Sequence, residues 1–129
     1  MATWRRRAIE GFPDLRSELN QPDYTIYRLF FDLLPATRKA HRANDETRLR
    51  AIYSFAEWCA RQRSQPLWNA AGVAFYEHLF DERWMWKDAA VWLPADVRAN
   101  CEVLWEARLS STEFAEVKRV LSSTPPRTH

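Results

Sequence analysis

The amino-acid sequence predicts an all-α fold, a single compact bundle of about five to six helices in which most neighbours along the chain pack antiparallel. Only two glycines occur in 129 residues, which leaves few positions for tight turns and long loops. Apolar residues recur at helical spacing through most of the chain. The sequence contains neither strict apolar–polar alternation nor the Asn-Gly or Asp-Gly turns typical of β-hairpins.

Length and composition fit one globular domain over residues 1–121, followed by a flexible C-terminal tail over residues 122–129 that contains two prolines. Hydrophobic residues make up 47% of the chain and charged residues 28%, and no apolar run is long enough for a membrane span. The arginines near the N-terminus are not followed by the apolar segment of a secretory leader. We therefore expect a cytoplasmic protein.

The first half of the chain contains three predicted helical segments. The first runs from residue 3 to about residue 19 in two pieces, with Pro13 at the start of the second piece. Pro35 must either kink the second segment or begin a new helix. Asp45 is a good N-cap for a third helix over residues 46–63. The second segment carries one apolar stripe at helical spacing, formed by Ile26, Leu29, Phe30, Leu33 and Leu34.

The second half contains three more predicted helices and one irregular stretch. A helix over residues 66–80 is apolar on nearly all sides, so we expect it at the centre of the bundle. Residues 81–93 show no regular periodicity. Pro94 opens a helix over residues 94–108, and Ser110 with Glu113 has the spacing of a capping box that starts the last helix.

No reaction signature appears in the sequence: it lacks a glycine-rich phosphate loop, a G-x-S-x-G elbow and an H-E-x-x-H pair. Cys59 and Cys101 lie on apolar stripes and are interpreted as buried thiols. Glu57 and Glu77 occupy matching Phe-x-Glu steps on successive helices, and we interpret them as salt-bridged or capping carboxylates. A third hypothesis, an enzyme that uses this pair, requires both side chains to converge in a pocket that solvent reaches. We expect no enzyme, and therefore no catalytic residue, metal or cofactor.

The formal net charge of +2 is too small to indicate a nucleic-acid partner. Trp4 beside Arg5, Arg6 and Arg7 has the composition of a short nucleic-acid-binding arm, because arginines neutralise phosphates and an indole stacks on bases. A small helical nucleic-acid-associated or regulatory protein that uses an arginine-rich surface is therefore the alternative hypothesis. The ordinary interpretation of these arginines is a solvated helix face.

The irregular stretch is the candidate partner-binding site. It places three tryptophans among charged residues, the mixture that is enriched in binding hot spots. A second interpretation, equally open from the sequence, is that the rings close one end of the bundle as part of its core. The predicted partner-binding residues are Asp81, Glu82, Trp84, Trp86, Asp88 and Trp92.

Three motifs support a family resemblance: Phe12-Pro13-x-Leu15, Ser54-Phe55-x-Glu57 and Asn69-x-x-x-Val73-x-Phe75-x-Glu77-x-Leu79. Over about residues 12–80, the chain resembles small all-helical bacterial immunity proteins of polymorphic-toxin and contact-dependent growth inhibition systems. The resemblance implies a cytoplasmic protein that binds a cognate toxin domain, often a nuclease, and occludes its active site without catalysis of its own.

The charge of the chain departs from what a nuclease target implies. Inhibitors of nucleases tend to be acidic, because they complement a phosphate-binding cleft, whereas this chain is mildly basic. Asp81, Glu82 and Asp88 are the residues from which a local acidic patch would form.

Overall fold

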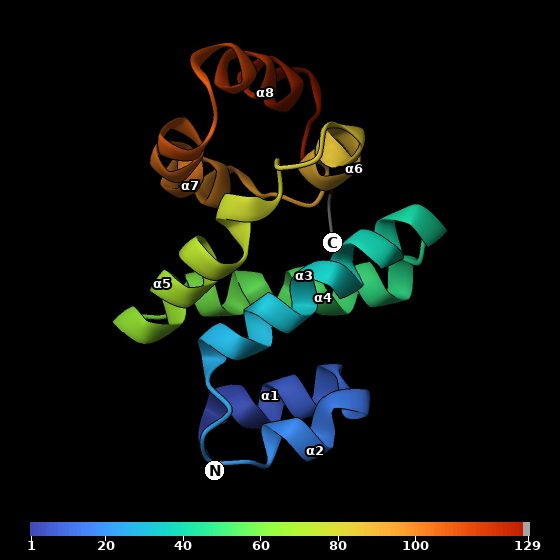
Figure 1. Ribbon diagram of the computed structural model, residues 1–129, viewed down its shortest axis with the longest axis vertical. Helices are drawn as coiled ribbons and strands as arrows, with labels where there is room; N and C mark the ends of the chain where they lie inside the picture. Colours follow the sequence, from blue (N-terminus) through green and yellow to red (C-terminus); the bar gives the residue numbers. More distant parts are fainter. Residues whose placement is uncertain (128–129) are drawn as a thin grey trace. The chain divides into compact units, whose positions relative to one another are not determined.

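The computed structural model describes residues 1–127, and these residues contain α-helices, three short 3-10 helices and no strand. The predicted all-α class is confirmed (Figure 1). The predicted number of helices is wrong, because the described chain contains eight α-helices rather than five to six. Two of them, α2 (Arg16–Leu19) and α6 (Trp86–Ala90), are only four and five residues long, too short for the periodicity of the sequence to distinguish them from turns.

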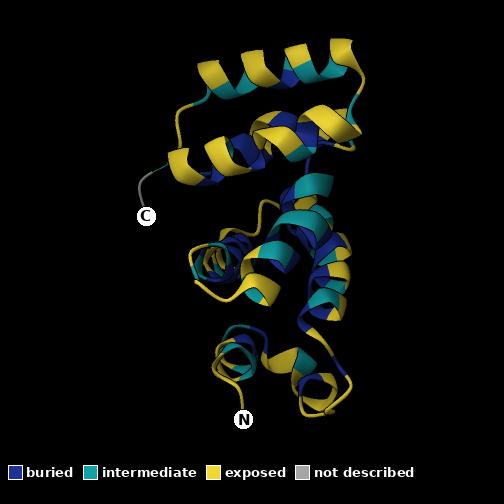
Figure 2. Cartoon of the chain, turned by 90° about the vertical axis from the view of Figure 1, so that its left-hand side faces the viewer, coloured by how far each residue is buried: buried dark blue, intermediate teal, exposed yellow. Residues whose placement is uncertain are grey.

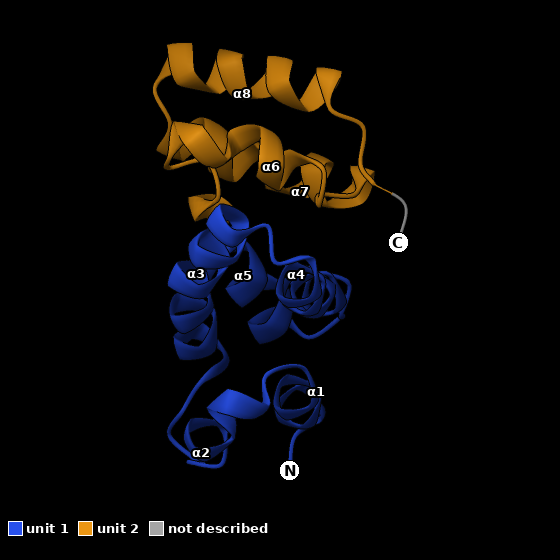
Figure 3. Ribbon diagram, turned by 90° about the vertical axis from the view of Figure 1, so that its right-hand side faces the viewer, with its two compact units in different colours: residues 1–75 blue, residues 76–129 orange. Residues whose placement is uncertain are grey.

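The contacts within the chain divide it into two compact units, Met1–Phe75 and Tyr76–His129 (Figure 3). Each unit is described here by itself. The division falls inside the segment that the sequence predicts as one helix over residues 66–80. A division by contacts does not tell whether the two units unfold together, so the single domain over residues 1–121 stays a prediction.

Unit 1 consists of five helices: α1 (Thr3–Gly11), α2, α3 (Ile26–Ala43), α4 (Glu46–Ala60) and α5 (Gln65–Ala74). The side chain of Thr25 accepts a hydrogen bond at the start of α3, and Asp45 does the same at the start of α4, as predicted. Asn44 closes α3 in the left-handed conformation, with φ of 51°. α3 is one helix with Pro35 inside it. Pro35 is exposed, where the loss of a helical hydrogen bond costs least because water is near.

Aromatic rings form the core of unit 1. The rings of Phe12 and Phe55 meet edge to face with centroids 5.7 Å apart, and Phe30 lies 5.7 Å from Phe55 and 5.6 Å from Phe75. Tyr53 contacts Phe75 at 5.8 Å. Phe55 lies off the main apolar face of α4, yet it is buried because α1 and the following turn cover that side of the helix.

Unit 2 contains the 3-10 turns Tyr76–His78 and Arg83–Met85, then α6, α7 (Ala95–Arg108) and α8 (Ser111–Ser123). The helix predicted over residues 66–80 ends at Ala74, and the backbone leaves helical geometry at Phe75. Trp105 is the largest fully buried side chain of this unit; its indole N–H donates to the carbonyl of Tyr76 at 2.8 Å and its ring meets Phe80 at 4.9 Å. The predicted capping box at Ser110 is confirmed.

Residues 122–127 of the C-terminal segment take part in contacts within unit 2, and the flexibility of the tail over residues 122–129 stays a prediction. Residues 122 and 123 belong to α8. The amide of Arg127 donates to the carbonyl of Val91 at 2.8 Å, and the guanidinium of Arg98 donates to the carbonyl of Thr124 at 2.6 Å. Residues 128 and 129 of the predicted tail lie outside the described residues. Among residues 1–127, no helix combines the length and the apolar content needed to cross a membrane.

Candidate partner-binding site

The predicted site folds as a 3-10 turn that leads into α6, and α6 packs against α8 within unit 2. One side of α8 is exposed along its length, while the other side carries buried and intermediate residues (Figure 2). The site is therefore part of a helix pair, although residues 81–93 show no regular periodicity in the sequence. In a helical conformation, residues two apart point to different sides.

Two of the three predicted tryptophans are buried, which corrects the expectation that they face a partner. The indole N–H of Trp86 donates to the carbonyl of Phe80 at 2.9 Å, and Arg83 stacks over the same ring at 4.4 Å. Trp92 is covered by the guanidinium of Arg127 at 4.4 Å. Both rings belong to the core of unit 2, with only 4% and 2% of their surface exposed.

Trp84 is the exposed ring of the three, with 42% of its surface accessible. Its indole N–H donates to the carboxylate of Glu82 at 2.6 Å, and this hydrogen bond holds the ring in one orientation on the surface. An exposed indole whose rotation is already restricted loses less entropy when a partner covers it. Trp84 therefore has the properties that a binding anchor requires.

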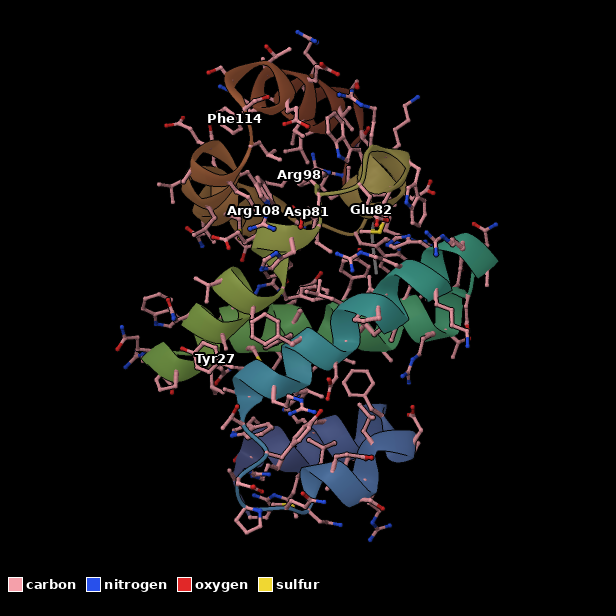
Figure 4. The ribbon with its side chains drawn as sticks, in the orientation of Figure 1. Tyr27, Asp81, Glu82, Arg98, Arg108 and Phe114 are labelled. Carbon is pink, nitrogen blue, oxygen red and sulfur yellow. The ribbon has the colours of Figure 1, made fainter. Side chains whose placement is uncertain are left out.

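One of the three acidic residues that the sequence assigns to a local patch, Asp81, is neutralised by an arginine. Asp81 lies beside Arg108 (Figure 4) and accepts two hydrogen bonds from it, at 2.6 and 2.8 Å. A ring nitrogen of His78 lies 3.4 Å from the same carboxylate. Burial alone would raise the pKa of Asp81, but the hydrogen bonds and charge of Arg108 outweigh burial and lower it. Glu82 accepts its hydrogen bond from the uncharged indole of Trp84, which does not cancel its charge, and Asp88 on α6 is exposed, so these two acidic residues of the predicted patch remain at the surface.

An open hollow of about 390 Å³ lies between α6 and α8, and we call it the α6–α8 groove. One wall comes from residues 83–87, with Arg83, Trp84, Trp86 and Lys87. The other wall comes from one face of α8, with Glu116, Arg119, Val120 and Ser123. The α8 residues were not predicted as site residues, although their spacing of three and four places them on one helix face. The sequence does not show that α8 packs beside α6.

Glu57 and Glu77 are each held by an arginine. Glu57 is buried on α4 with Arg61 at 3.7 Å, and Glu77 lies 3.9 Å from Arg108. These pairings agree with structural carboxylates and do not favour a shared catalytic role. Within residues 1–127, no group of three or more His, Cys, Asp and Glu side chains is placed to hold a metal ion.

The N-terminal arginines take part in the structure of unit 1. Arg5 donates hydrogen bonds to the carbonyls of Leu19, Gln21 and Pro22, at 2.8, 3.0 and 3.1 Å. Arg7 stacks over the ring of Trp58 at 4.5 Å. Two of the three arginines of the predicted arm are therefore engaged within the protein.

Comparison with known protein families gives a match over most of the chain. Residues 5–110 match the family described as "Domain of unknown function (DUF7674)". The searches of curated proteins and of solved structures found no match. The matched region includes the 83–87 wall of the groove, whereas α8 lies beyond it. Because the match covers well over half of the chain, this protein is a member of the DUF7674 family.

Proposed function

We propose that this protein is an immunity-type binding protein of the cytoplasm that neutralises a cognate bacterial toxin domain by occluding it, without catalysis of its own. The observation that carries the proposal is the exposed indole of Trp84 at the edge of the α6–α8 groove. Large rings beside concave, partly apolar surface are the usual anchors of protein interfaces. The resemblance to immunity proteins supplies the class of partner.

The motifs that carry the resemblance have a structural role in this proposal. Phe12, Phe55 and Phe75 make the aromatic core of unit 1, and Glu57 is buried beside Arg61. Such residues maintain a scaffold and leave recognition to surface positions. The proposed contact surface therefore lies in unit 2, around Trp84.

The test is co-expression with the toxin domain encoded by the gene immediately upstream, followed by measurement of growth and of the Kd of the purified pair. We expect wild-type protein to bind and to protect. Replacing Trp84 by Ala should weaken binding by about 2 kcal/mol, which is roughly thirtyfold in Kd, because the anchor ring is lost. Trp68→Ala is the matched control, since Trp68 is a similarly exposed tryptophan of α5 in unit 1 with 44% of its surface accessible.

Two results would contradict the proposal. A wild-type chain that neither binds nor protects removes the toxin partner. Equal losses of affinity in Trp84→Ala and Trp68→Ala would show that the surface around Trp84 is not the contact.

The alternative function, a nucleic-acid-associated or regulatory protein, has less support. The guanidinium of Arg5 is occupied by main-chain carbonyls, and that of Arg7 by Trp58. This alternative predicts binding of DNA or RNA that weakens steeply with salt. A gel-shift titration at two salt concentrations distinguishes it from the protein-binding proposal, which predicts little binding under either condition.

A further inference from the structure

Basic side chains outnumber acidic side chains on the two walls of the α6–α8 groove. Arg83, Lys87 and Arg119 supply three basic side chains, and Glu116 supplies one acidic side chain. Arg83 forms an ion pair with Glu116 across the groove, so these two charges largely cancel. The groove therefore keeps a net charge of +2 that comes from Lys87 and Arg119.

Lys87 and Arg119 are available to a ligand. Both are exposed, one on each wall of the groove. Among residues 1–127, neither side chain forms an ion pair or a hydrogen bond. A partner carboxylate beside either of them would gain a charge-assisted contact without breaking an existing pair.

The groove also offers apolar surface beside these two charges. Trp86 lines it, with Arg83 stacked on its ring. Val120 contributes from α8, and the exposed ring of Trp84 borders the opposite wall. A ligand with apolar side chains between its charges would bury them here, which a purely ionic ligand would not do.

We propose that the α6–α8 groove binds an acidic segment of a protein partner, whose carboxylates pair with Lys87 and Arg119 and whose apolar side chains cover Trp84 and Val120. This inference rests on the proposed function, because it names the chemistry of the surface that the toxin partner presents. It reverses the charge expected from the sequence, where Asp81, Glu82 and Asp88 would meet a basic nuclease cleft. In the structure Asp81 is paired with Arg108, and the groove is basic.

A nucleic acid is the other polyanion to consider, and the groove fits it less well. Two unpaired cations would neutralise about two phosphates, which gives a slope of log K against log salt of only about −1.4 for a single strand. Grooves that bind single strands present several stacking rings, whereas Trp84 is the exposed ring here.

The test uses two-dimensional amide NMR spectra of the full chain at neutral pH and low salt. The probe is a short peptide of Asp-Leu-Asp repeats, compared with the Lys-Leu-Lys peptide and with an oligo-dT strand of equal length. We expect the acidic peptide to shift the amides of Lys87, Arg119 and Val120 and the indole N–H of Trp84. The other two probes should leave these signals in place.

The matched variants separate the groove from the overall charge. Replacing both Lys87 and Arg119 by Glu should weaken binding of the acidic peptide by about tenfold or more in Kd, since attraction becomes repulsion. Reversing Arg6 and Arg63 to Glu changes the net charge equally, and both are exposed residues of unit 1, so it should have a much smaller effect. Unchanged spectra outside the substituted positions establish that each variant is folded.

The inference is overturned if the acidic peptide shifts no groove signal, or if both double variants weaken binding of the acidic peptide equally. It is also overturned if oligo-dT shifts the groove signals at a lower concentration than the acidic peptide does. These outcomes are separate from the test of the toxin partner. A toxin complex that forms and is unaffected by the Lys87 and Arg119 reversals contradicts the groove and leaves the proposed function in place. A chain that binds the acidic peptide but no toxin domain contradicts only the proposed function.

Discussion

Replacing Arg98 by Met should destabilise this protein more than any other substitution of a single arginine proposed here. Arg98 lies on α7, and its guanidinium donates to the carbonyls of Leu93, Leu121 and Ala90 at 2.7 Å each and to that of Thr124 at 2.6 Å. The carbonyls of Ala90 and Leu93 belong to the end of α6 and the turn before α7, and those of Leu121 and Thr124 to the end of α8. One side chain therefore ties together two parts of unit 2 that are far apart in the sequence.

The size of the effect follows from the number and type of these hydrogen bonds. A hydrogen bond to a charged group contributes about 1.5–3 kcal/mol when it is buried, and we count about 1 kcal/mol for each because the site is partly exposed. Met retains most of the apolar stem of Arg, which offsets some of the loss. We expect a loss of about 3 kcal/mol in the free energy of unfolding. For a chain of this length that corresponds to a fall in Tm of about 11 °C.

Urea unfolding followed by circular dichroism measures this change. Arg98→Lys should still lose about 2 kcal/mol, because a single ammonium group does not reach carbonyls on several sides as the planar guanidinium does. Arg119→Met is the control: the same replacement on exposed α8, where no side-chain partner is lost among residues 1–127, should change stability by less than about 0.5 kcal/mol. If the free energy of unfolding of Arg98→Met lies within about 0.5 kcal/mol of the wild-type value, the four hydrogen bonds do not stabilise the fold as argued.

Three further results are expected. Asp81→Asn should lower the free energy of unfolding by about 1 kcal/mol at neutral pH, a modest loss because the pair with Arg108 is partly exposed. Since the pKa of Asp81 is lowered in the folded protein, the difference from wild type should be full above about pH 5 and should disappear as the pH falls through that lowered pKa, and a constant difference down to about pH 2 would contradict this. Trp105→Phe should lose about 2 kcal/mol in urea unfolding, because a buried main-chain carbonyl loses its donor and a small cavity forms; a neutral effect would show that the site repacks. Burial raises the pKa of Cys59 and of Cys101 to about 12, so neither thiol should react with Ellman's reagent at pH 8 until denaturant unfolds the chain, and rapid reaction of native protein would argue against that burial.

Local signals predicted the helix starts well. Asp45 caps α4 and Ser110 with Glu113 caps α8, as the residue types and spacing indicate. The prediction failed where apolar spacing continued through a break: Phe75 and Tyr76 are both fully buried, yet the helix ends at Ala74. Periodicity records which residues are apolar, and it does not record where tertiary packing bends the backbone.

The candidate site was predicted in part, because the sequence indicated a cluster of rings and charges without indicating which rings face outward. Trp86 and Trp92 are buried in the core of unit 2, and Arg83 and Arg127 stack on their rings from positions that depend on the fold. Arg119 was missed because α8 is distant from the irregular stretch in the sequence and meets α6 only in the folded unit.

The sequence by itself determined the all-helical class and several helix caps, because both depend on residues within a few positions of one another. Only the tertiary structure decided which tryptophan is exposed, which acidic residue is neutralised and which basic residues share a groove. Those properties depend on contacts between distant segments: Arg108 reaches Asp81 across 27 positions and Arg83 reaches Glu116 across 33. A local pattern holds no information about such pairs, so the sign of the charge at the proposed binding surface became readable only in the folded chain.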